Sequence, residues 1–452
     1  MDKLLWKRKS VWEKGDEYRK KAFSVAEEYK KFMDSCKTER EVVEWIKREI
    51  ERIGFLKDGS EKFYIVNREK CIAVVKLGEG EGMKLIAAHI DSPRIDLKQR
   101  PLYEDKDTQL VLLHTHYYGG VKKYQWMNIP LAIHGKVVKK NGEILNINIG
   151  EDDDDPLFVI PDLLPHLARK EQYEKKVDEA FSAEKLNPIV GSMPDLSEKE
   201  EKVKASVLHL LYEKYGISEE DLASAELELV PAWKSRDTGI DRSFIAAYGQ
   251  DDRICAFTAF KAFMESNNKK TCMVLLVDKE EIGSDGATGM KSHFFLRPVI
   301  EILKRKGEKA DMDNIIQFLE KSECLSADVN GAVNPLYKDV HEMDNASYIN
   351  RGVVLTKYTG HKGKYEASDA SAEFLGKLRS IFDQNDVLWQ IGELGKVDEG
   401  GGGTIAKYIA QWNVEVVDCG PAILSMHSPY EISSKGDLYE TFKAYKAFFE
   451  SE

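Results

Sequence analysis

The sequence predicts an α/β fold in which a β-rich segment interrupts a layered core. Three apolar runs are uninterrupted by polar residues and separated by helical stretches, which is typical of strands covered on both faces of a sheet. A middle region instead alternates apolar and polar residues, as hairpin strands do. The 452 residues, 42% of them hydrophobic, are enough for two domains. The apolar runs lie within residues 82–94, 271–289 and 412–431.

The N-terminal part of the core carries two predicted helices followed by two short strands. Between residues 16 and 53, apolar side chains recur at three- and four-residue spacing in a densely charged sequence. This pattern predicts a pair of amphipathic helices. Residues 62–66 and 71–76 then have the pattern of short strands and lead into the first apolar run.

The middle of the chain is predicted to form an inserted domain. Residues 108–118 and 129–150 alternate in hydrophobicity, and Asn141-Gly142 supplies a hairpin turn. After Pro161 the sequence becomes helical in pattern and heavily charged until about residue 225. We therefore assign residues 98–234 to the inserted domain and residues 1–97 plus 235–452 to the core.

Composition argues against several classes of function. A net charge of −12 is unfavourable for a nucleic-acid partner, which needs a basic surface. No window approaches the roughly 18–20 apolar residues of a membrane-spanning helix, and the charged N-terminus does not have the pattern of a signal peptide. The six cysteines are scattered without a C-x-x-C pair, which indicates reduced thiols and a cytoplasmic location.

Polar clusters follow the apolar runs, and the first of them holds a histidine and an aspartate. His89 and Asp91 are two residues apart on an extended chain, so their side chains point to the same face. A carboxylate beside a metal-bound imidazole is the usual device that fixes the orientation of the ring. Taken alone, a histidine at a strand end is more simply interpreted as a hydrogen-bonded polar residue than as a metal ligand.

Adjacent acidic pairs form the second and third clusters. Asp251 and Asp252 precede a helical stretch, where capping of the helix N-terminus is the simpler interpretation. Glu280 and Glu281 end a buried strand beside a glycine-rich turn, where two carboxylates are costly unless a cation is present. One glutamate is then able to bind a metal while the other serves as general base. A solvated loop is the alternative.

The last two clusters contain Asp328 and His427. Each is weak evidence alone, but all five clusters lie at the ends of predicted strands. In open α/β sheets the ligand crevice lies outside the carboxyl ends of the strands. Nitrogen and oxygen donors without thiolate suit Zn²⁺, Mn²⁺ or Co²⁺. Together the clusters predict a two-metal hydrolase site.

Six motifs in this sequence resemble those of the M18 family of metallo-aminopeptidases and occur in the family's order. A weaker likeness to the M42 family rests mainly on D-D-R and E-E-x-G. The M18 resemblance implies a zinc-peptidase-like α/β/α sandwich with an inserted β-rich dimerisation domain. It also implies two divalent metal ions, with Zn²⁺ favoured over Mn²⁺ or Co²⁺, and a homo-oligomer, specifically a dodecamer. The motifs are AAHIDSPR (87–94), YGQDDRICAF (248–257), VDKEEIGSDGATG (277–289), SADVNGAVNP (326–335), GGGTIA (401–406) and LSMHSPYE (424–431).

The resemblance further implies a role for each candidate residue. Asp251 is expected to bridge the two metals, and the two histidines are expected to be terminal ligands, one on each metal. Glu280 is the implied general base, and Asp91 is expected to orient the first histidine. The assignment of the bridge to Asp251 rather than Asp252 depends on the alignment by a single position. The implied metal ligands are His89, Asp251, Glu281, Asp328 and His427.

Two further positions bear on the substrate. His166 matches a histidine that is expected to reach a neighbouring subunit's substrate pocket, with metal binding as the alternative. In mammalian-type aspartyl aminopeptidases, a lysine after G-P-V-I is thought to meet the acidic side chain of the substrate. Here Thr356 aligns with that lysine and Lys357 is displaced by one position, which on a strand points to the opposite face. The segment is closer to the vacuolar members, which prefer leucine-like residues, so a preference for Asp or Glu stays open.

The predicted function is hydrolysis of the N-terminal residue, neutral or acidic, from short peptides at a two-metal site. The alternatives are an inactive, metal-binding oligomeric scaffold and a carboxypeptidase or deacylase of the wider metallohydrolase group. Every expected ligand is present, which argues against the scaffold. No unassigned arginine pair offers an anion clamp for a C-terminal carboxylate, and the absence of G-x-S-x-G argues against covalent catalysis.

Overall fold

The chain folds into two compact units. The computed structural model describes residues 4–57 and 59–452. The boundary that the sequence pattern places after residue 97 falls inside a strand of the second unit, β4 (Arg94–Asp105). Unit 1 comprises Met1–Ser92, Ser235–Met426 and Tyr430–Glu452, and unit 2 comprises Pro93–Lys234 with His427–Pro429.

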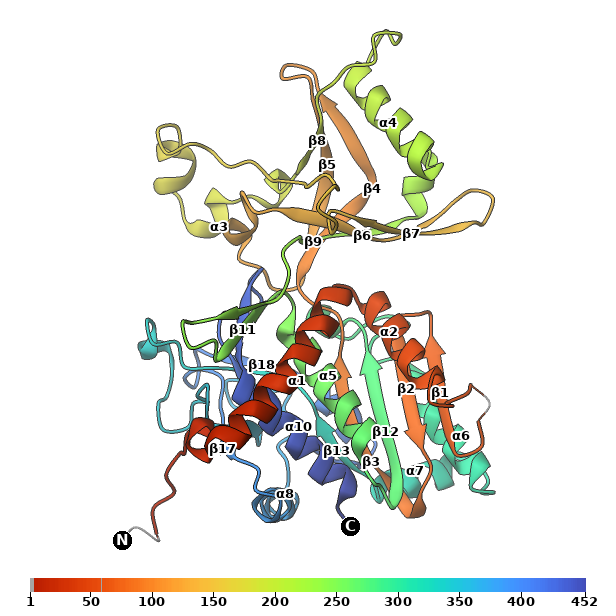
Figure 1. Ribbon diagram of the computed structural model, residues 1–452, viewed down its shortest axis with the longest axis vertical. Helices are drawn as coiled ribbons and strands as arrows, with labels where there is room; N and C mark the ends of the chain where they lie inside the picture. Colours follow the sequence, from red (N-terminus) through yellow and green to blue (C-terminus); the bar gives the residue numbers. More distant parts are fainter. Residues whose placement is uncertain (1–3, 58) are drawn as a thin grey trace. The chain divides into compact units, whose positions relative to one another are not determined.

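Unit 1 is built on a mixed eight-stranded sheet with the order β1-β2-β12-β3-β13-β19-β15-β17 (Figure 1). Strand β3 pairs in parallel with β12 on one side and with β13 on the other, and β13 pairs in parallel with β19. The three predicted apolar runs form β3, β12 and β19, so all three point in the same direction. The strands are β1 Lys62–Asn67, β2 Cys71–Lys76, β3 Glu79–His89, β12 Lys270–Val277, β13 Glu323–Ser326, β15 Val353–Thr356, β17 Trp389–Ile391 and β19 Glu415–Gly420.

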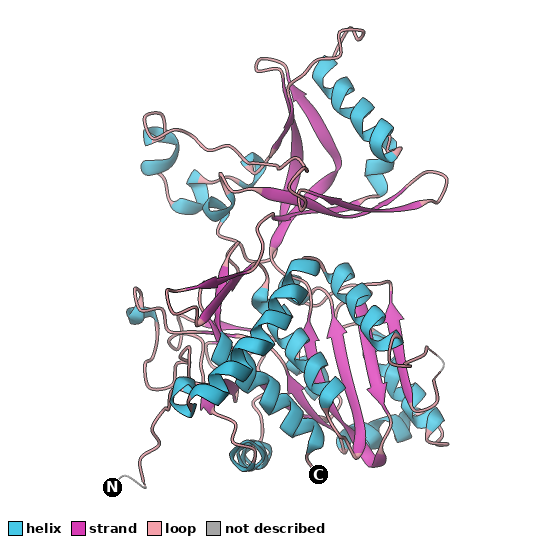
Figure 2. Ribbon diagram, in the orientation of Figure 1, coloured by secondary structure: helices cyan, strands magenta, loops and turns pink. Residues whose placement is uncertain are grey.

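Helices pack against this sheet, as Figure 2 shows, and two hydrophobic cores fill its two faces. Along β3, Ile86 and Ala88 belong to the core shared with α1, α2, α5, α8 and α10. The alternate residues Leu85 and Ala87 belong to the core shared with α6, α7 and α9. The predicted α/β class is therefore confirmed. The helices are α1 Asp16–Ser35, α2 Glu39–Glu51, α5 Gln250–Glu265, α6 Leu296–Arg305, α7 Met312–Glu320, α8 Ala372–Gln384, α9 Ala406–Ala410 and α10 Lys435–Glu450.

The N-terminal helix pair is present as predicted. Helix α2 begins with a capping box, in which Thr38 accepts a hydrogen bond from the backbone of Glu41 and the Glu41 side chain accepts one in return. Helix α1 packs against α5 and α10, and nearly every residue of α5 is buried. The N-terminal turn of α5 is therefore held firmly inside the unit, which matters because that turn carries an acidic pair.

Unit 2 contains a six-stranded sheet of order β7-β6-β9-β4-β5-β8. The hairpin predicted at Asn141-Gly142 is confirmed, since β6 and β7 pair antiparallel around it and Gly142 has a φ of +85°. The helical pattern after Pro161 is borne out mainly by α4 (Lys202–Tyr215), and much of the rest forms loops and short turns. Charged residues without an apolar stripe do not fix a helix. The remaining elements are β5 Leu110–Tyr118, β6 Leu131–Val138, β7 Ile144–Ile149, α3 Val177–Ala180, β8 Ile189–Gly191 and β9 Glu226–Pro231.

Unit 1 also contains the cysteines and several small sheets. All six cysteines are free thiols, and all six are buried in unit 1. Among residues 4–57 and 59–452, no helix is both long and apolar enough to span a membrane. The small sheets pair β10 Arg236–Thr238, β11 Phe244–Ala247 and β21 Glu431–Ser434, then β14 Asn330–Gly331 with β20 Ala422–Ile423, and β16 Gly360–His361 with β18 Gly401–Gly402.

Candidate metal centre

The predicted ligands of unit 1 meet at one edge of the eight-stranded sheet. His89 is the last residue of β3, Glu280 follows the end of β12 by three residues, and Asp328 follows the end of β13 by two. Because these three strands are parallel neighbours, their carboxyl ends lie together (Figure 1). The shared edge explains why residues as far apart in sequence as His89 and Asp328 lie in one cluster.

The first turn of α5 adds an aspartate to this edge. Gly249 has a φ of +68°, and Asp251 and Asp252 have non-helical backbone angles although they lie at the start of α5. The Asp251 carboxylate lies 3.1 Å from Nε2 of His89, and His89 Nε2 is 4.0 Å from Asp328 Oδ1. The Asp251 side chain thus faces the site, where the sequence pattern alone made helix capping the simpler interpretation.

Within unit 1, two sets of donor atoms are close enough to hold an ion. In each set the nitrogen or oxygen atoms lie within 4.8 Å of one another. His89 belongs to both sets, so it links the acidic first turn of α5 to the glutamate pair after β12. Asp252 belongs to neither. The two sets are His89, Asp251 and Asp328, and His89, Glu280 and Glu281.

Asp91 connects the histidine to the glutamate pair. Its carboxylate accepts hydrogen bonds from the backbone N–H groups of Glu280 and Glu281, at 3.1 and 3.2 Å. The same carboxylate lies 3.4 Å from Nδ1 of His89, and the Asp91 carbonyl lies 3.0 Å from that nitrogen. Asp91 therefore contacts the His89 ring and also the short helical turn Glu280–Ile282, and the second contact is one that the sequence did not indicate.

The electrostatics of this edge favour a cation. Burial raises the pKa of Asp328 well above its usual range, and the charges of Asp252 and Asp251 raise it further. Burial alone lowers the pKa of His89, but hydrogen bonds with Asp251 and Asp91 outweigh burial and raise it well above its usual value. A negative field that holds a proton on His89 also attracts a divalent ion. Nitrogen and carboxylate donors without thiolate fit Zn²⁺.

A buried arginine that sequence reasoning did not single out supports the acidic turn. The Arg253 guanidinium is fully buried and donates to the carbonyls of Gly249, Cys36 and Tyr248. It also donates to the Ser92 hydroxyl at 3.3 Å, and Ser92 in turn donates to the Asp251 carbonyl at 2.8 Å. The adjacency of arginine to the acidic pair was visible in the sequence, but its partners Cys36 and Ser92 come from two distant segments.

The second predicted histidine lies in the short piece of unit 2 that follows Met426. His427 has a φ of +64°, and its Nδ1 lies 3.0 Å from the Gly120 carbonyl oxygen. His166 also lies in unit 2, where it is exposed in a turn. Among the described residues, His166 joins neither of the two donor sets above.

The position that the sequence predicts to bear on the substrate, Thr356, is neutral and hydrogen-bonded. The Thr356 hydroxyl accepts a hydrogen bond from the Asn330 amide at 2.9 Å, and Ser347 donates to Asn330 Oδ1 at 2.7 Å. The adjacent Lys357 instead forms an ion pair with Asp369. Thr356 ends β15 and Lys357 lies just beyond it, and the two side chains have different partners.

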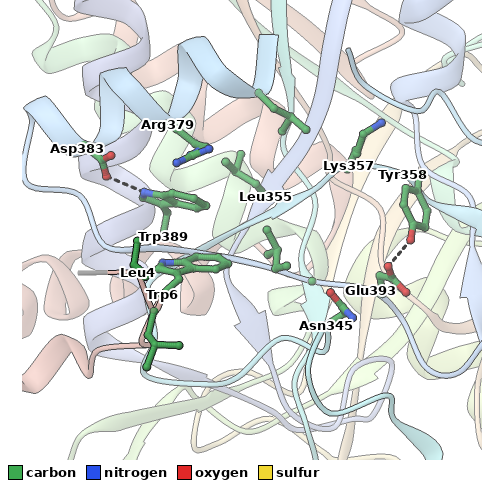
Figure 3. A pocket seen from close by; sticks show the side chains of 14 residues that line it. Leu4, Trp6, Asn345, Leu355, Lys357, Tyr358, Arg379, Asp383, Trp389 and Glu393 are labelled. Atoms are coloured by element: carbon green, nitrogen blue, oxygen red, sulfur yellow. Dashed lines mark hydrogen bonds between the residues drawn. The ribbon is translucent and has the colours of Figure 1, made fainter. Parts of the chain in front are cut away.

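Lys357 lines a separate cavity of about 710 Å³ in unit 1 (Figure 3). Trp6 and Trp389 lie in this cavity with ring centroids 4.9 Å apart, and Arg379 lies over the Trp389 ring. Tyr358 donates a hydrogen bond to Glu393 at its other end. The Lys357 side chain therefore lines this cavity and forms an ion pair with Asp369.

Comparisons with known proteins give one consistent result. A family model described as aminopeptidase I zinc metalloprotease (M18) matches residues 32–449. A probable M18 family aminopeptidase 1 of Clostridium acetobutylicum is 49% identical over 463 aligned positions, which cover 98% of each chain. The crystal structure of an M18 family aminopeptidase from Thermotoga maritima is 47% identical, with a TM-score of 0.96 over 99% of this chain and 100% of that one. An S. cerevisiae protein solved as the mApe1 dodecamer shares the fold, with a TM-score of 0.72 and 22% identity over 94% of this chain and 96% of that one.

Proposed function

The chain belongs to the M18 family of aminopeptidase I zinc metalloproteases, and from that premise we propose that it removes the N-terminal residue of short peptides at a two-metal site. Members of the family are metal-dependent aminopeptidases, and so is this chain. The observation that carries the proposal is the convergence of His89, Asp251, Asp328 and the glutamate pair at one sheet edge.

We assign the bridge between the two ions to Asp251. Its carboxylate approaches His89, whereas Asp252 is in neither donor set. The histidines are the terminal ligands in this assignment, one on each ion. Zn²⁺ is the proposed metal because the family is a zinc family and the donors are nitrogen and carboxylate oxygen. The proposed ligands are His89, Asp251, Glu281, Asp328 and His427.

Glu280 is the proposed general base. Divalent ions in such a site supply Lewis-acid polarisation of the scissile carbonyl and lower the pKa of the attacking water. The Glu280 carboxylate takes one proton from that water and returns it to the leaving amine. Asp91 holds the backbone of Glu280 and the ring of His89 in a fixed relation, so the base keeps its distance from the ligand.

Replacement of Glu280 tests the assignment of the base. Glu280→Gln is expected to lower kcat by roughly 10²–10⁴-fold, because the amide does not accept the proton. The metal content is expected to stay at the wild-type level, measured by inductively coupled plasma mass spectrometry. Glu308→Gln, at an exposed position of the same unit, is the matched control and is expected to be fully active. Near-normal turnover by Glu280→Gln would overturn the assignment.

We propose that neutral, leucine-like residues are preferred at the N-terminus of the substrate. Thr356 offers a hydroxyl group and no positive charge, and Lys357 is paired with Asp369. A panel of Asp-, Glu-, Leu- and Lys-anilides, each assayed with Zn²⁺, Mn²⁺ and Co²⁺, measures the preference. We expect the highest kcat/KM for Leu-anilide. Strong activity on Asp-anilide alone would refute the preference for neutral residues.

We also propose a homo-oligomer, specifically a dodecamer, by analogy with the S. cerevisiae protein. In that assembly unit 2 would serve as the dimerisation domain, and His166 would reach the substrate pocket of a neighbouring subunit. The exposure of His166 supports such a role because an exposed imidazole is accessible to another chain. A cytoplasmic location is consistent with six free, buried thiols.

A further inference from the structure

A glycine of unit 2 lies against the imidazole of His427. The Gly120 carbonyl oxygen is 3.0 Å from His427 Nδ1. A carbonyl oxygen accepts hydrogen bonds and does not donate them, so Nδ1 is the donor and carries the ring hydrogen. In the neutral imidazole, Nε2 is then the nitrogen with the lone pair, which is the atom that a metal binds.

A side chain on Gly120 would crowd this ring. A Cβ atom on Gly120 would lie 3.1 Å from His427 Nδ1 and 3.6 Å from Cε1. Apart from His427 and the two chain neighbours of Gly120, no described residue has a heavy atom within 4 Å of that Cβ. The backbone of Gly120 is outside the left-handed region, so alanine is accommodated there without backbone strain. An added methyl group would therefore displace the His427 ring by a few tenths of an ångström and disturb little else.

A second contact fixes the short segment that carries His427. Trp233 Nε1 donates to the Pro429 carbonyl at 3.2 Å. The backbone of residues 427–429 is thus held two residues beyond the histidine, while Gly120 holds the ring itself. The position of the ring is determined at both points by residues of unit 2.

We propose that Gly120 is a positioning residue of the metal centre. Its carbonyl selects the His427 tautomer that presents Nε2 to the ion, and its missing side chain lets the ring occupy the binding position. Groups that orient a metal-bound histidine typically change metal affinity by about 10–100-fold. Ligand distances tolerate deviations of only about 0.2 Å, so a shift of the ring by a methyl contact is large enough to matter. The inference rests on the proposed role of His427 as a ligand.

The test compares Zn²⁺ affinity among variants of the full-length protein. Each protein is stripped of metal and titrated with Zn²⁺ against a competing chromophoric chelator, which reports affinity and stoichiometry without an activity assay. Gly120→Ala is expected to bind the ion that depends on His427 at least about tenfold more weakly, and Gly120→Val more weakly still. Gly376→Ala, in α8, is the matched control, because a Cβ there meets nothing within 4 Å. It is expected to bind both ions as the wild type does.

His427→Ala distinguishes the ligand role of His427 from the positioning role of Gly120. Loss of one ion in His427→Ala together with weak binding in Gly120→Ala supports the inference. Loss of one ion in His427→Ala with wild-type affinity in Gly120→Ala would overturn the role of Gly120 and leave the ligand in place. Full metal content in His427→Ala would overturn the ligand assignment itself. A metal-free Gly120→Ala protein that unfolds at a markedly lower temperature than the wild type would also overturn the inference, because the methyl group would then disturb more than the ring.

Discussion

Arg253 supplies a buried positive charge beside a group of buried carboxylates. Its guanidinium donates to three carbonyl oxygens and to Ser92, and it fills the space that a side chain on Gly249 would need, since a Cβ there would lie 1.5 Å from Nη2. A planar group with five donors in a fixed fork suits such a set of acceptors. The positive charge also offsets part of the repulsion among the acidic side chains.

Replacement of Arg253 by lysine is expected to destabilise the protein although the charge is kept. An ammonium group has three donors and cannot reach all four acceptors, so buried carbonyls lose their partners at about 1–3 kcal/mol each. We expect a total loss of about 3 kcal/mol in the free energy of unfolding, measured by urea denaturation. Arg297→Lys, at an exposed position of α6, is the control and is expected to change stability little. Equal stability of the two variants would contradict the structural role of Arg253.

At the scale of single elements, the central strand β19 carries an unusual carboxylate. Asp418 is buried inside the sheet, and burial raises its pKa to about 6, although the nearby side chains of Ser326 and Thr404 act in the opposite direction. Because the folded protein binds this proton more tightly than the unfolded chain does, Asp418 stabilises the fold fully below pH 4. That contribution is lost as the pH rises through about 6.

The pH dependence of stability tests this property of β19. Between pH 4 and pH 7 the wild type is expected to lose about 2 kcal/mol from Asp418 alone. Asp418→Asn removes the titrating group, so the stability of the variant relative to the wild type is expected to rise by that amount over the same range. Urea denaturation at both pH values measures the difference. A difference that does not change with pH would contradict the raised pKa of Asp418.

The longer elements were predictable because their hydrophobic patterns are strong. The helix pair α1 and α2, the apolar strands β3 and β12, and the β6–β7 hairpin all follow from periodicity or from turn residues. Strands β15 and β17 have only four and three residues and carry no readable period. The sequence pattern places the domain boundary after residue 97, whereas unit 2 begins at Pro93, because β4 continues directly from the polar cluster that ends β3.

The candidate site was predictable in residue type and less so in contacts. Acidic and histidine side chains at strand ends are visible in the sequence, so His89, Glu280 and Asp328 could be named. The support from Ser92 and the contact of Gly120 with His427 could not, because each joins residues 159 or more positions apart. Contacts of this kind depend on the register and order of strands, which local patterns do not determine.

At the scale of the whole molecule, metal binding is expected to be coupled to stability. An ion at the acidic edge of the sheet relieves the burial cost of carboxylates such as Asp328, whose pKa is raised in its absence. A ligand that binds the folded state alone and is present at about 100 times its Kd stabilises by about 2.7 kcal/mol. Removal of metal by a chelator is therefore expected to lower the Tm by several degrees.

Differential scanning calorimetry with and without a chelator measures this coupling. Added Zn²⁺ is expected to restore the original Tm, while Ca²⁺ is the control and is expected to restore little, because it prefers six to eight oxygen ligands. An unchanged Tm after removal of the metal, verified by mass spectrometry, would contradict the coupling of metal binding to folding.

The reactivity of the six thiols reports the unfolding of unit 1. All six are buried, and all six belong to unit 1, with none in unit 2. An alkylating reagent therefore modifies the native chain only when unit 1 opens. Each modified thiol adds the mass of one reagent group, so the rate of mass increase reports how often unit 1 opens. Pulsed alkylation read by mass spectrometry then follows the kinetic lifetime of unit 1 without a label, and partial unfolding confined to unit 2 leaves the mass unchanged.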